Sequence, residues 1–384
     1  HLSIRRQRQM CIRDRPYEGQ EYFSQLKGEY KGLSFNGYYK YFNVDAALTT
    51  RVLNLFTLAL PVTGTTQSLT ADVQYSWPIG ESVHLIPGVN TRFMYYTYDE
   101  KDFRKELNGV PLNQELMVGG FIHCEVKPIS VLSVVLDTRY DWFSITKPAL
   151  SPRLAVSYTV AEGHILRAAG GQSFRKPVWL EAQAVSEHSL LKRIFKVPIG
   201  NPDVGNELVR TVELGYRSYL RKDLRLEGNL FYDQYTDFIN LRASMEPPVP
   251  IFRQDNIKAL LWGAGGEAEA GYDPFSWLKS DVSYSYIYKK DFIAGETVKF
   301  PQHKATLSVK FSPVGLPFIG LMGQYTGKYT YSVANPVTMA TEKQDVPAYT
   351  LMNAVLGHSF LDGKVEAGLH VFNLFNSRHR ESTF

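Results

Sequence analysis

Hydrophobic and polar residues alternate along much of this chain, most clearly between Glu207 and Ile239. A polar turn at Arg221–Asp223 separates two alternating segments of more than ten residues each. A period of two places successive side chains on opposite faces of a β-strand, so the stretch predicts two long strands joined as a hairpin. The apolar face carries Val212, Leu214, Tyr216, Leu224, Leu226, Leu230 and Tyr232.

Seven further pairs of segments with the same alternation surround this hairpin, so the chain predicts about sixteen strands and an all-β fold. No long segment has a competing helical period. The predicted pairs are 20–30 with 33–43, 68–77 with 82–98, 113–127 with 129–144, 150–160 with 164–174, 256–272 with 278–289, 303–312 with 318–331, and 349–360 with 364–375. The predicted turns include Pro128 and Asp273–Pro274.

Short and long connections alternate along the chain. Turns within the pairs are short, whereas most connections between pairs are long: 44–67, 99–112, 176–206, 243–255, 290–302 and 332–346. An outer-membrane barrel has this arrangement, with tight turns on the periplasmic side and long loops outside. A soluble β-sandwich is the alternative, but it has no reason to place its long loops at every second connection.

The two faces of the predicted strands differ in chemistry. Leu132, Val134 and Leu136 alternate with polar residues, and the segments around Val73 and Val282 repeat the pattern. Lipid offers no hydrogen bonds, so the apolar face is expected to form the outer wall and the polar face the lumen. Cys124 falls on an apolar face and is expected to be an inert small hydrophobe.

Composition alone does not choose between a barrel and a soluble β-protein. The chain is 44% hydrophobic, with 24 Tyr and 22 Phe, and no run approaches the length of a membrane-spanning helix. Residues 1–15 lack alternation and are expected to be a non-native, adaptor-derived segment, the alternative being a genuine basic arm that binds nucleic acid or membrane. They carry five arginines and one aspartate, a net of +4, which equals the net charge of the whole chain. Residues 16–384 are therefore neutral, and no nucleic-acid partner is expected.

Motifs for catalysis or cofactor binding are not evident in the sequence. Gly263–Ala268 fits a loose dinucleotide-binding pattern, but it continues into an alternating strand instead of opening a helix. His123 and Glu125 share a lumen face, where a hydrogen-bonded pair is favoured over a metal site. We therefore expect neither an enzyme, nor a resident cofactor, nor a metal site.

Five blocks, in order, resemble the barrel domain of TonB-dependent outer-membrane receptors. In that family an Asn-Pro-x-Leu-x-Pro-Glu segment leads into a strand reading Glu-Leu-Gly-Tyr-Arg. Here Asn201–Glu207 leads into Glu213–Arg217, with Asn206 in place of the second proline. The other similar blocks are Leu150–Ala155, Ser173–Pro177, Val346–Thr350, and Asn373–Asn376 followed by Arg378–Arg380.

The resemblance implies a fragment of a transmembrane antiparallel barrel of about 22 strands, in the bacterial outer membrane. About five strands and a plug domain would precede residues 16–384, and one strand would follow them. The expected function is import of a scarce ligand, such as an iron–siderophore chelate, haem, cobalamin, another metal chelate or a glycan. The expected partners are outer-membrane lipid, this cargo, and the TonB–ExbB–ExbD complex acting through the plug.

The longest connection, 176–206, is expected to hold cargo near the extracellular mouth. The candidate ligand-binding residues are Arg175, Trp179, His188, Arg193 and Phe195. The alternative function is a passive porin or structural barrel, and a barrel enzyme such as a phospholipase or protease ranks below it.

Overall fold

The wall of the protein is one large antiparallel sheet. The computed structural model describes residues 18–52, 56–98, 106–107, 110–111, 113–182, 200–246, 249–258, 260–291, 300–334, 341–361 and 364–379. Each long strand pairs with the next long strand along the chain, from β1 to β23. Among the described residues, no helix has both the length and the apolar character needed to cross a membrane.

Sixteen long strands build the sheet, as the alternation predicts, and the three-residue β4 brings the count to seventeen. They are β1 (Glu18–Tyr30), β2 (Leu33–Val52), β3 (Phe56–Tyr75), β4 (Trp77–Ile79), β5 (Val83–Tyr98), β8 (Gln114–Ile129), β9 (Leu132–Phe143), β10 (Ala149–Ala161), β11 (His164–Arg175), β12 (Glu207–Arg221), β13 (Leu224–Thr236), β16 (Leu261–Phe275), β17 (Leu278–Asp291), β18 (His303–Phe311), β19 (Phe318–Thr326), β22 (Tyr349–Phe360) and β23 (Val365–Val371).

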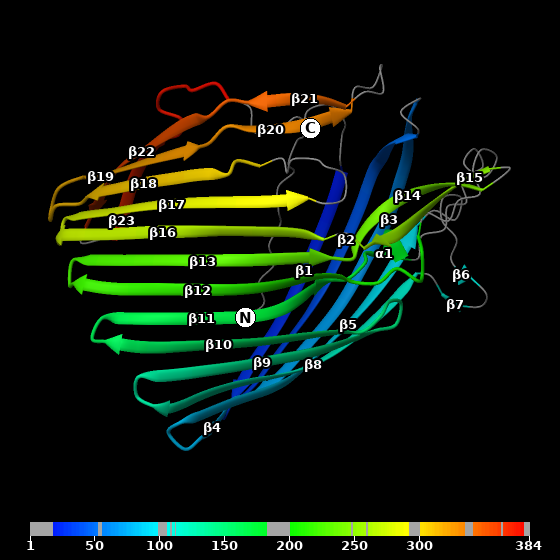
Figure 1. Ribbon diagram of the computed structural model, residues 1–384, viewed down its shortest axis with the longest axis horizontal. Helices are drawn as coiled ribbons and strands as arrows, with labels where there is room; N and C mark the ends of the chain where they lie inside the picture. Colours follow the sequence, from blue (N-terminus) through cyan, green and yellow to red (C-terminus); the bar gives the residue numbers. More distant parts are fainter. Residues whose placement is uncertain are drawn as a thin grey trace.

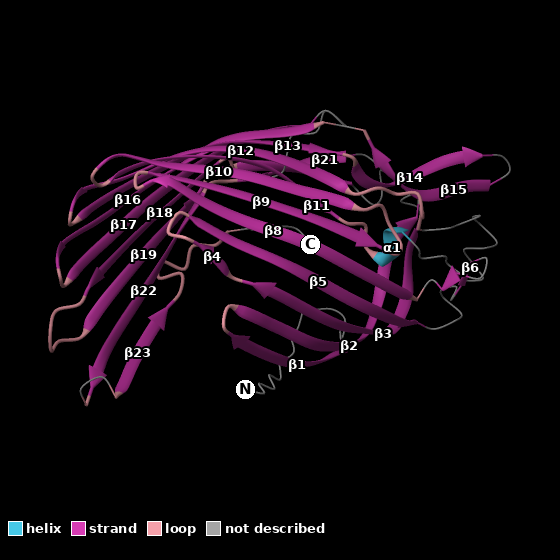
Figure 2. Ribbon diagram, turned by 90° about the horizontal axis from the view of Figure 1, so that it is seen from below, coloured by secondary structure: helices cyan, strands magenta, loops and turns pink. Residues whose placement is uncertain are grey.

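The long strands lie side by side as a strongly curved wall (Figures 1 and 2). The tight turns gather at one end, which we call the turn end. The opposite end, which we call the rim, carries the short helix α1 (Trp179–Ala182) and three small hairpins. These hairpins pair β6 (Glu106–Leu107) with β7 (Val110–Pro111), β14 (Phe238–Glu246) with β15 (Val249–Ile257), and β20 (Tyr329–Ala334) with β21 (Thr341–Val346).

Two predicted turns are misplaced. The turn expected at Pro128 lies at Ser130–Val131, because Pro128 is accommodated in β8 where the register shifts between Val126 and Ile129. The turn expected at Asp273–Pro274 lies at Ser276–Trp277, after a second register shift in β16. A β-bulge leaves one residue unpaired, so proline can occupy it without breaking the ladder.

Several of the predicted long connections contain strands. The expected loop 44–67 is wrong, because β2 and β3 continue pairing to Val52 and Phe56. The connection 243–255 belongs to the β14–β15 hairpin. Tyr329–Tyr331, expected to extend β19, begins β20 and pairs with β21 instead. These hairpins prolong the protein beyond the rim.

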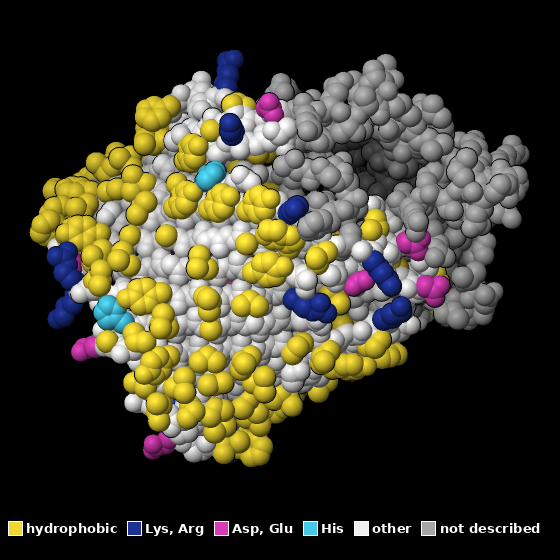
Figure 3. Space-filling view, in the orientation of Figure 1, with side chains coloured by type: hydrophobic (Ala, Val, Ile, Leu, Met, Phe, Trp, Pro, Cys, Tyr) yellow, Lys and Arg dark blue, Asp and Glu magenta, His cyan; other side chains and the backbone are white. Residues whose placement is uncertain are grey.

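The outer face of the wall is apolar, as predicted. Cross-strand neighbours on this face include Leu214 and Leu230, whose side chains are 56% and 63% exposed. Figure 3 shows hydrophobic side chains spread over the wall with few charged groups among them. Cys124 pairs with Leu85 and Leu136 on the same face and is half-buried. Gly263–Ala268 lies wholly within β16, which confirms the strand prediction for this stretch.

The inner face carries polar ladders that cross several strands. Gln25 donates to Asn36, Asn36 donates to Asp72, and Arg139 joins Asn90 to Asp141. His123 contacts Asp137 at 2.6 Å, whereas Glu125 accepts a hydrogen bond from Ser133. His123 and Glu125 thus share the lumen face, as predicted, but each has a partner on β9. The ladders satisfy polar groups that the wall could not satisfy from lipid.

Three phenylalanines on the inner face lie flat over glycines of the neighbouring strand. The register pairs Phe121 with Gly88, Phe231 with Gly265 and Phe318 with Gly357. In each pair a Cβ built on the glycine would collide with the phenylalanine ring. The glycines therefore let bulky rings lie along the wall instead of projecting into the lumen.

Gly265→Ala is expected to destabilise the protein by about 1–3 kcal/mol, because its Cβ would meet a ring and a backbone oxygen together. The Cβ would lie 2.5 Å from Phe231 Cζ and would also collide with the Tyr286 carbonyl, which rotation of a side chain cannot relieve. Gly323→Ala is the control, since no heavy atom would lie within 4 Å of its Cβ. Urea unfolding in lipid vesicles measures both changes, and equal losses would contradict the packing argument.

Candidate functional site

The rim end of β11 places Arg175 between two carboxylates. Arg175 pairs in register with Glu207 of β12, and its Nε and Nη2 donate to both oxygens of Glu207 at 2.5 and 2.7 Å. Its Nη1 and Nη2 donate to the oxygens of Glu181 in α1 at 2.9 and 3.1 Å. Paired N–H donors of arginine fit a carboxylate in two parallel hydrogen bonds, which fixes geometry as well as charge. Arg175 therefore ties β11, α1 and β12 together.

Both carboxylates also hold backbone groups. Glu181 accepts from the Val178 N–H at 2.9 Å, and Glu207 accepts from the Ile239 N–H at 2.9 Å. Glu207 is at the rim, beyond the exposed apolar residues of β12. Burial of Glu207 raises the pKa of its carboxyl, but the hydrogen bonds from Arg175 and Ile239 outweigh that effect and hold the pKa below its ordinary value. Glu207 is thus held as the anion that Arg175 requires.

A second ion pair lies beside this cluster. Lys176 contacts Glu115 of β8, whose side chain is only 3% exposed. The Tyr96 hydroxyl donates to the same carboxylate at 3.3 Å, and the Lys176 ammonium lies 5.7 Å from the centre of the Phe143 ring. The buried Trp179 packs against Tyr96, with ring centroids 5.7 Å apart. Helix α1 is therefore anchored to the wall by apolar packing as well as by charge.

The segment that enters β12 is fixed by asparagines. Asn201 donates through Nδ2 to the Gln254 carbonyl at 2.8 Å and through its backbone N–H to the Glu181 carbonyl at 2.9 Å. Asn256 exchanges hydrogen bonds with Gly205 and also donates to the Asp237 carbonyl at 2.7 Å. The block that leads into β12 is thus bound to α1 and to the β14–β15 hairpin.

Two of the five candidate ligand-binding residues lie in this rim structure. Arg175 is engaged by two carboxylates and Trp179 is buried, while His188, Arg193 and Phe195 lie outside the described residues. Glu115, Lys176 and Asn256 also form the rim, and no motif in the sequence marks them. Their partners are dozens of residues away along the chain, so no local pattern could reveal them.

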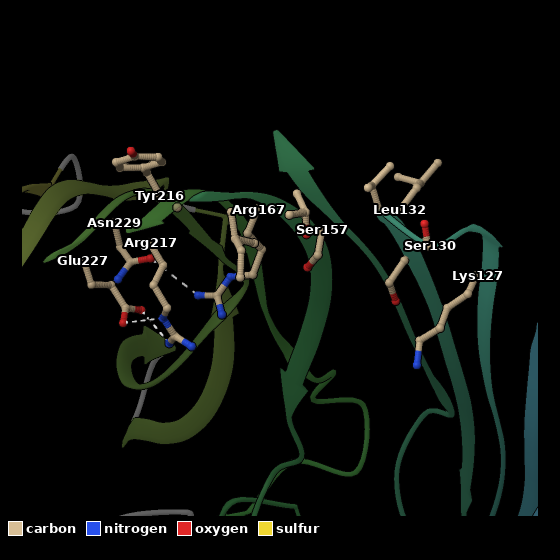
Figure 4. Close-up of a pocket in the computed structure, with 14 residues that line it drawn as sticks. Lys127, Ser130, Leu132, Ser157, Arg167, Tyr216, Arg217, Glu227 and Asn229 are labelled. Atoms are coloured by element: carbon tan, nitrogen blue, oxygen red, sulfur yellow. Dashed lines mark hydrogen bonds and ion pairs between the residues drawn. The ribbon is translucent and has the colours of Figure 1, made fainter. Parts of the chain in front are cut away.

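The lumen side of the wall offers a second, more open feature near the turn end. A groove of about 280 Å³ lies between β8 and β13 and is lined by charged and hydroxyl side chains. Figure 4 shows Tyr216 and Leu132 on one side of the wall and Lys127, Arg167 and Arg217 on the other. Arg217 is held by Glu227 at 2.9 and 3.0 Å. In the described part of the chain, no group of three His, Cys, Asp or Glu side chains is arranged to hold a metal ion.

Side chains alternate along the strands, so that the wall is apolar outside and polar inside, as in a membrane barrel. Comparison with known proteins shows which kind of barrel it is. The family model described as TonB dependent receptor-like, beta-barrel, matches residues 12–374. The chain belongs to the TonB-dependent receptor family. Receptors of this family are transport proteins of the bacterial outer membrane and not an enzyme family. The search of curated proteins finds no matching sequence.

Solved receptor structures share the fold at low sequence identity. The FrpB iron transporter of Neisseria meningitidis has a TM-score of 0.72 at 16% identity, covering 94% of this chain and 59% of that one. A PfeA mutant, the ferric enterobactin receptor of Pseudomonas aeruginosa in complex with enterobactin, has a TM-score of 0.72 at 14%, covering 94% and 57%. The siderophore receptor PirA of Acinetobacter baumannii has a TM-score of 0.70 at 14%, covering 94% and 58%. The chain thus spans somewhat more than half the length of these receptors.

Proposed function

We propose that this receptor imports a scarce chelate, such as an iron–siderophore complex, across the outer membrane in a step energised by the TonB complex. The observation that carries the proposal is the family match over residues 12–374. The similar solved structures are siderophore and iron receptors, which supports this class of cargo. In this proposal the TonB–ExbB–ExbD complex acts through a plug domain seated against the polar inner face.

The rim is the proposed base of the cargo site. Arg175 and its two carboxylates hold α1, and the buried Trp179 packs the same helix on the wall. Residues 183–199 follow α1 directly, so this anchoring sets where that segment starts and ends. We assign cargo contact to His188, Arg193 and Phe195 in that segment, and a supporting role to Arg175 and Trp179. Aromatic and cationic side chains suit an anionic, aromatic-rich chelate.

Uptake of radiolabelled ferric siderophore by cells that express the full-length receptor tests this function. We expect uptake that needs TonB and the proton gradient, and a loss of at least about tenfold in affinity for the variant H188A/R193A/F195A, since each lost polar or aromatic contact typically weakens binding severalfold. Lys222→Ala, at the exposed turn end, is the control and should leave uptake unchanged.

The outcomes separate the two candidate functions. Uptake that survives removal of TonB, together with ion conductance through the purified protein, would replace the proposal with a passive porin. TonB-dependent uptake with unchanged affinity in the triple variant would keep the function and remove these three residues from the cargo site.

A further inference from the structure

One arginine lies on the membrane side of the wall instead of the lumen side. Arg210 of β12 shares its face with Val212, Leu214 and Tyr216, which are 56%, 56% and 40% exposed. Its own side chain is exposed as well. An unpaired arginine on the lipid-facing side of a barrel is unfavourable unless it lies near the polar interface or meets an anion.

Arg210 reaches no carboxylate of the described structure although it lies on the outer face; Arg92 and Arg167 also reach none, but they lie on the inner face. On the inner face Arg139, Arg217 and Arg225 each reach a carboxylate, at 2.6, 2.9 and 2.5 Å. None of the ion pairs between described residues includes Arg210. Its side-chain partner is Gln172, whose Oε1 accepts from Nε at 3.0 Å. Gln172 is oriented in turn by its own donation to the Leu150 carbonyl at 3.1 Å. The positive charge of Arg210 is therefore positioned but not neutralised within the described structure.

The height of Arg210 on the wall matches the head-group region. The strand register places Gln172, Arg210, Gln234, Trp262 and Lys290 in one row across five neighbouring strands. The next outward-facing row toward the middle of the wall is apolar or aromatic. Its Tyr232 stacks on Trp262 with ring centroids 6.1 Å apart. Aromatic girdles of this kind mark the border between the hydrocarbon and the head groups. The row lies toward the rim, on the side of the long loops, and so at the outer leaflet.

We propose that Arg210, together with Gln172 and Gln234, binds the phosphate of an outer-leaflet lipid. Guanidinium donors match phosphate oxygens in paired hydrogen bonds, and the two amides supply further donors on either side. The acyl chains of the same lipid would lie along the exposed apolar positions below, beginning with Val212. The inference rests on the outer-membrane location of the receptor and not on the identity of its cargo.

Native mass spectrometry of the full-length receptor, presented with lipid A, dephosphorylated lipid A or inorganic phosphate, tests the site. Arg210→Gln should weaken lipid A binding about fivefold, the contribution of one basic residue at an anionic lipid surface, and Arg210→Lys should retain part of it. Arg167→Gln, which removes an arginine from the inner face of the adjacent strand, should leave lipid A binding unchanged. Heat-dependent electrophoretic mobility verifies that each variant is a folded barrel.

Equal lipid A binding by the wild type and Arg210→Gln would overturn the proposal. So would an equal loss in Arg167→Gln, or an equal loss with the dephosphorylated lipid, since either result would place the effect outside a phosphate site on the outer face. Saturation of the same site by inorganic phosphate at the concentrations that suffice for lipid A would show that the lipid part contributes nothing, and would also refute it.

Discussion

Val282→Arg is expected to destabilise the membrane-inserted receptor by about 2–4 kcal/mol, whereas Ser283→Arg next to it should have little effect. Val282 is 45% exposed on the outer face and pairs with Ala270 and Leu307, so an arginine there would face hydrocarbon. Ser283 faces the lumen, where it hydrogen-bonds Thr306 and pairs in register with Glu269. A cation at position 283 would meet water and a carboxylate.

Denaturant unfolding in vesicles of one lipid composition measures both variants under the same conditions. Val282→Ala is the additional control, because it removes the apolar side chain without adding charge. A loss in Ser283→Arg as large as that in Val282→Arg would contradict the assignment of inner and outer faces. A loss in Val282→Ala equal to that in Val282→Arg would attribute the effect to packing instead of lipid exposure.

The alternation of side chains was sufficient to predict the wall. Each strand that crosses the membrane must present an apolar face to lipid and a polar face to the lumen, so the physical requirement appears directly in the sequence. This is why Leu214 and Leu230, or Glu213 and Asn229, could be assigned to faces without coordinates. The prediction of about sixteen strands is confirmed for the same reason.

The same reasoning explains where the strand prediction was wrong. Outside the membrane no face of a strand has to meet lipid, so nothing requires a period of two, and the outer parts of β2 and β3 lie within the predicted loop 44–67. A strand of twenty residues is about twice what a tilted membrane crossing needs. The misplaced turns at Pro128 and Asp273–Pro274 have a different cause, since a bulge accommodates a proline that the sequence pattern treats as a breaker.

The rim was predicted only in outline. Resemblance to the family drew attention to Arg175, but it did not identify Glu181 and Glu207 as its partners. The carboxylates that reach Arg175 depend on which strand lies beside β11 and on how α1 folds back. Both are features of the tertiary structure. Lys176 and Glu115 show the same limit, because the two residues carry no motif and meet only when β8 and the end of β11 reach the rim together.

Lys176→Met is expected to reduce stability by about 3–5 kcal/mol, the largest effect expected for a rim substitution, because it leaves a buried carboxylate without its cation. The Glu115 side chain is 3% exposed and, among the described residues, would retain only the hydrogen bond from the Tyr96 hydroxyl. Glu115→Gln should cost less, since the Lys176 side chain is 21% exposed and its ammonium can turn toward water.

The double variant K176M/E115Q decides whether the ion pair or the packing around it holds the rim. If the loss in Lys176→Met comes from an unpaired buried charge, removing that charge as well should restore much of the stability. The double variant should then have a larger free energy of unfolding than Lys176→Met. Unfolding free energies of the four proteins, measured in the same vesicles, form the complete cycle. Additive losses would contradict coupling between the two charges and would assign the loss in Lys176→Met to another contact of the ammonium, such as that with the Phe143 ring. A double variant more stable than Lys176→Met would mean that the buried carboxylate is tolerated at the rim only because Lys176, the residue next to the Arg175 cluster, neutralises it.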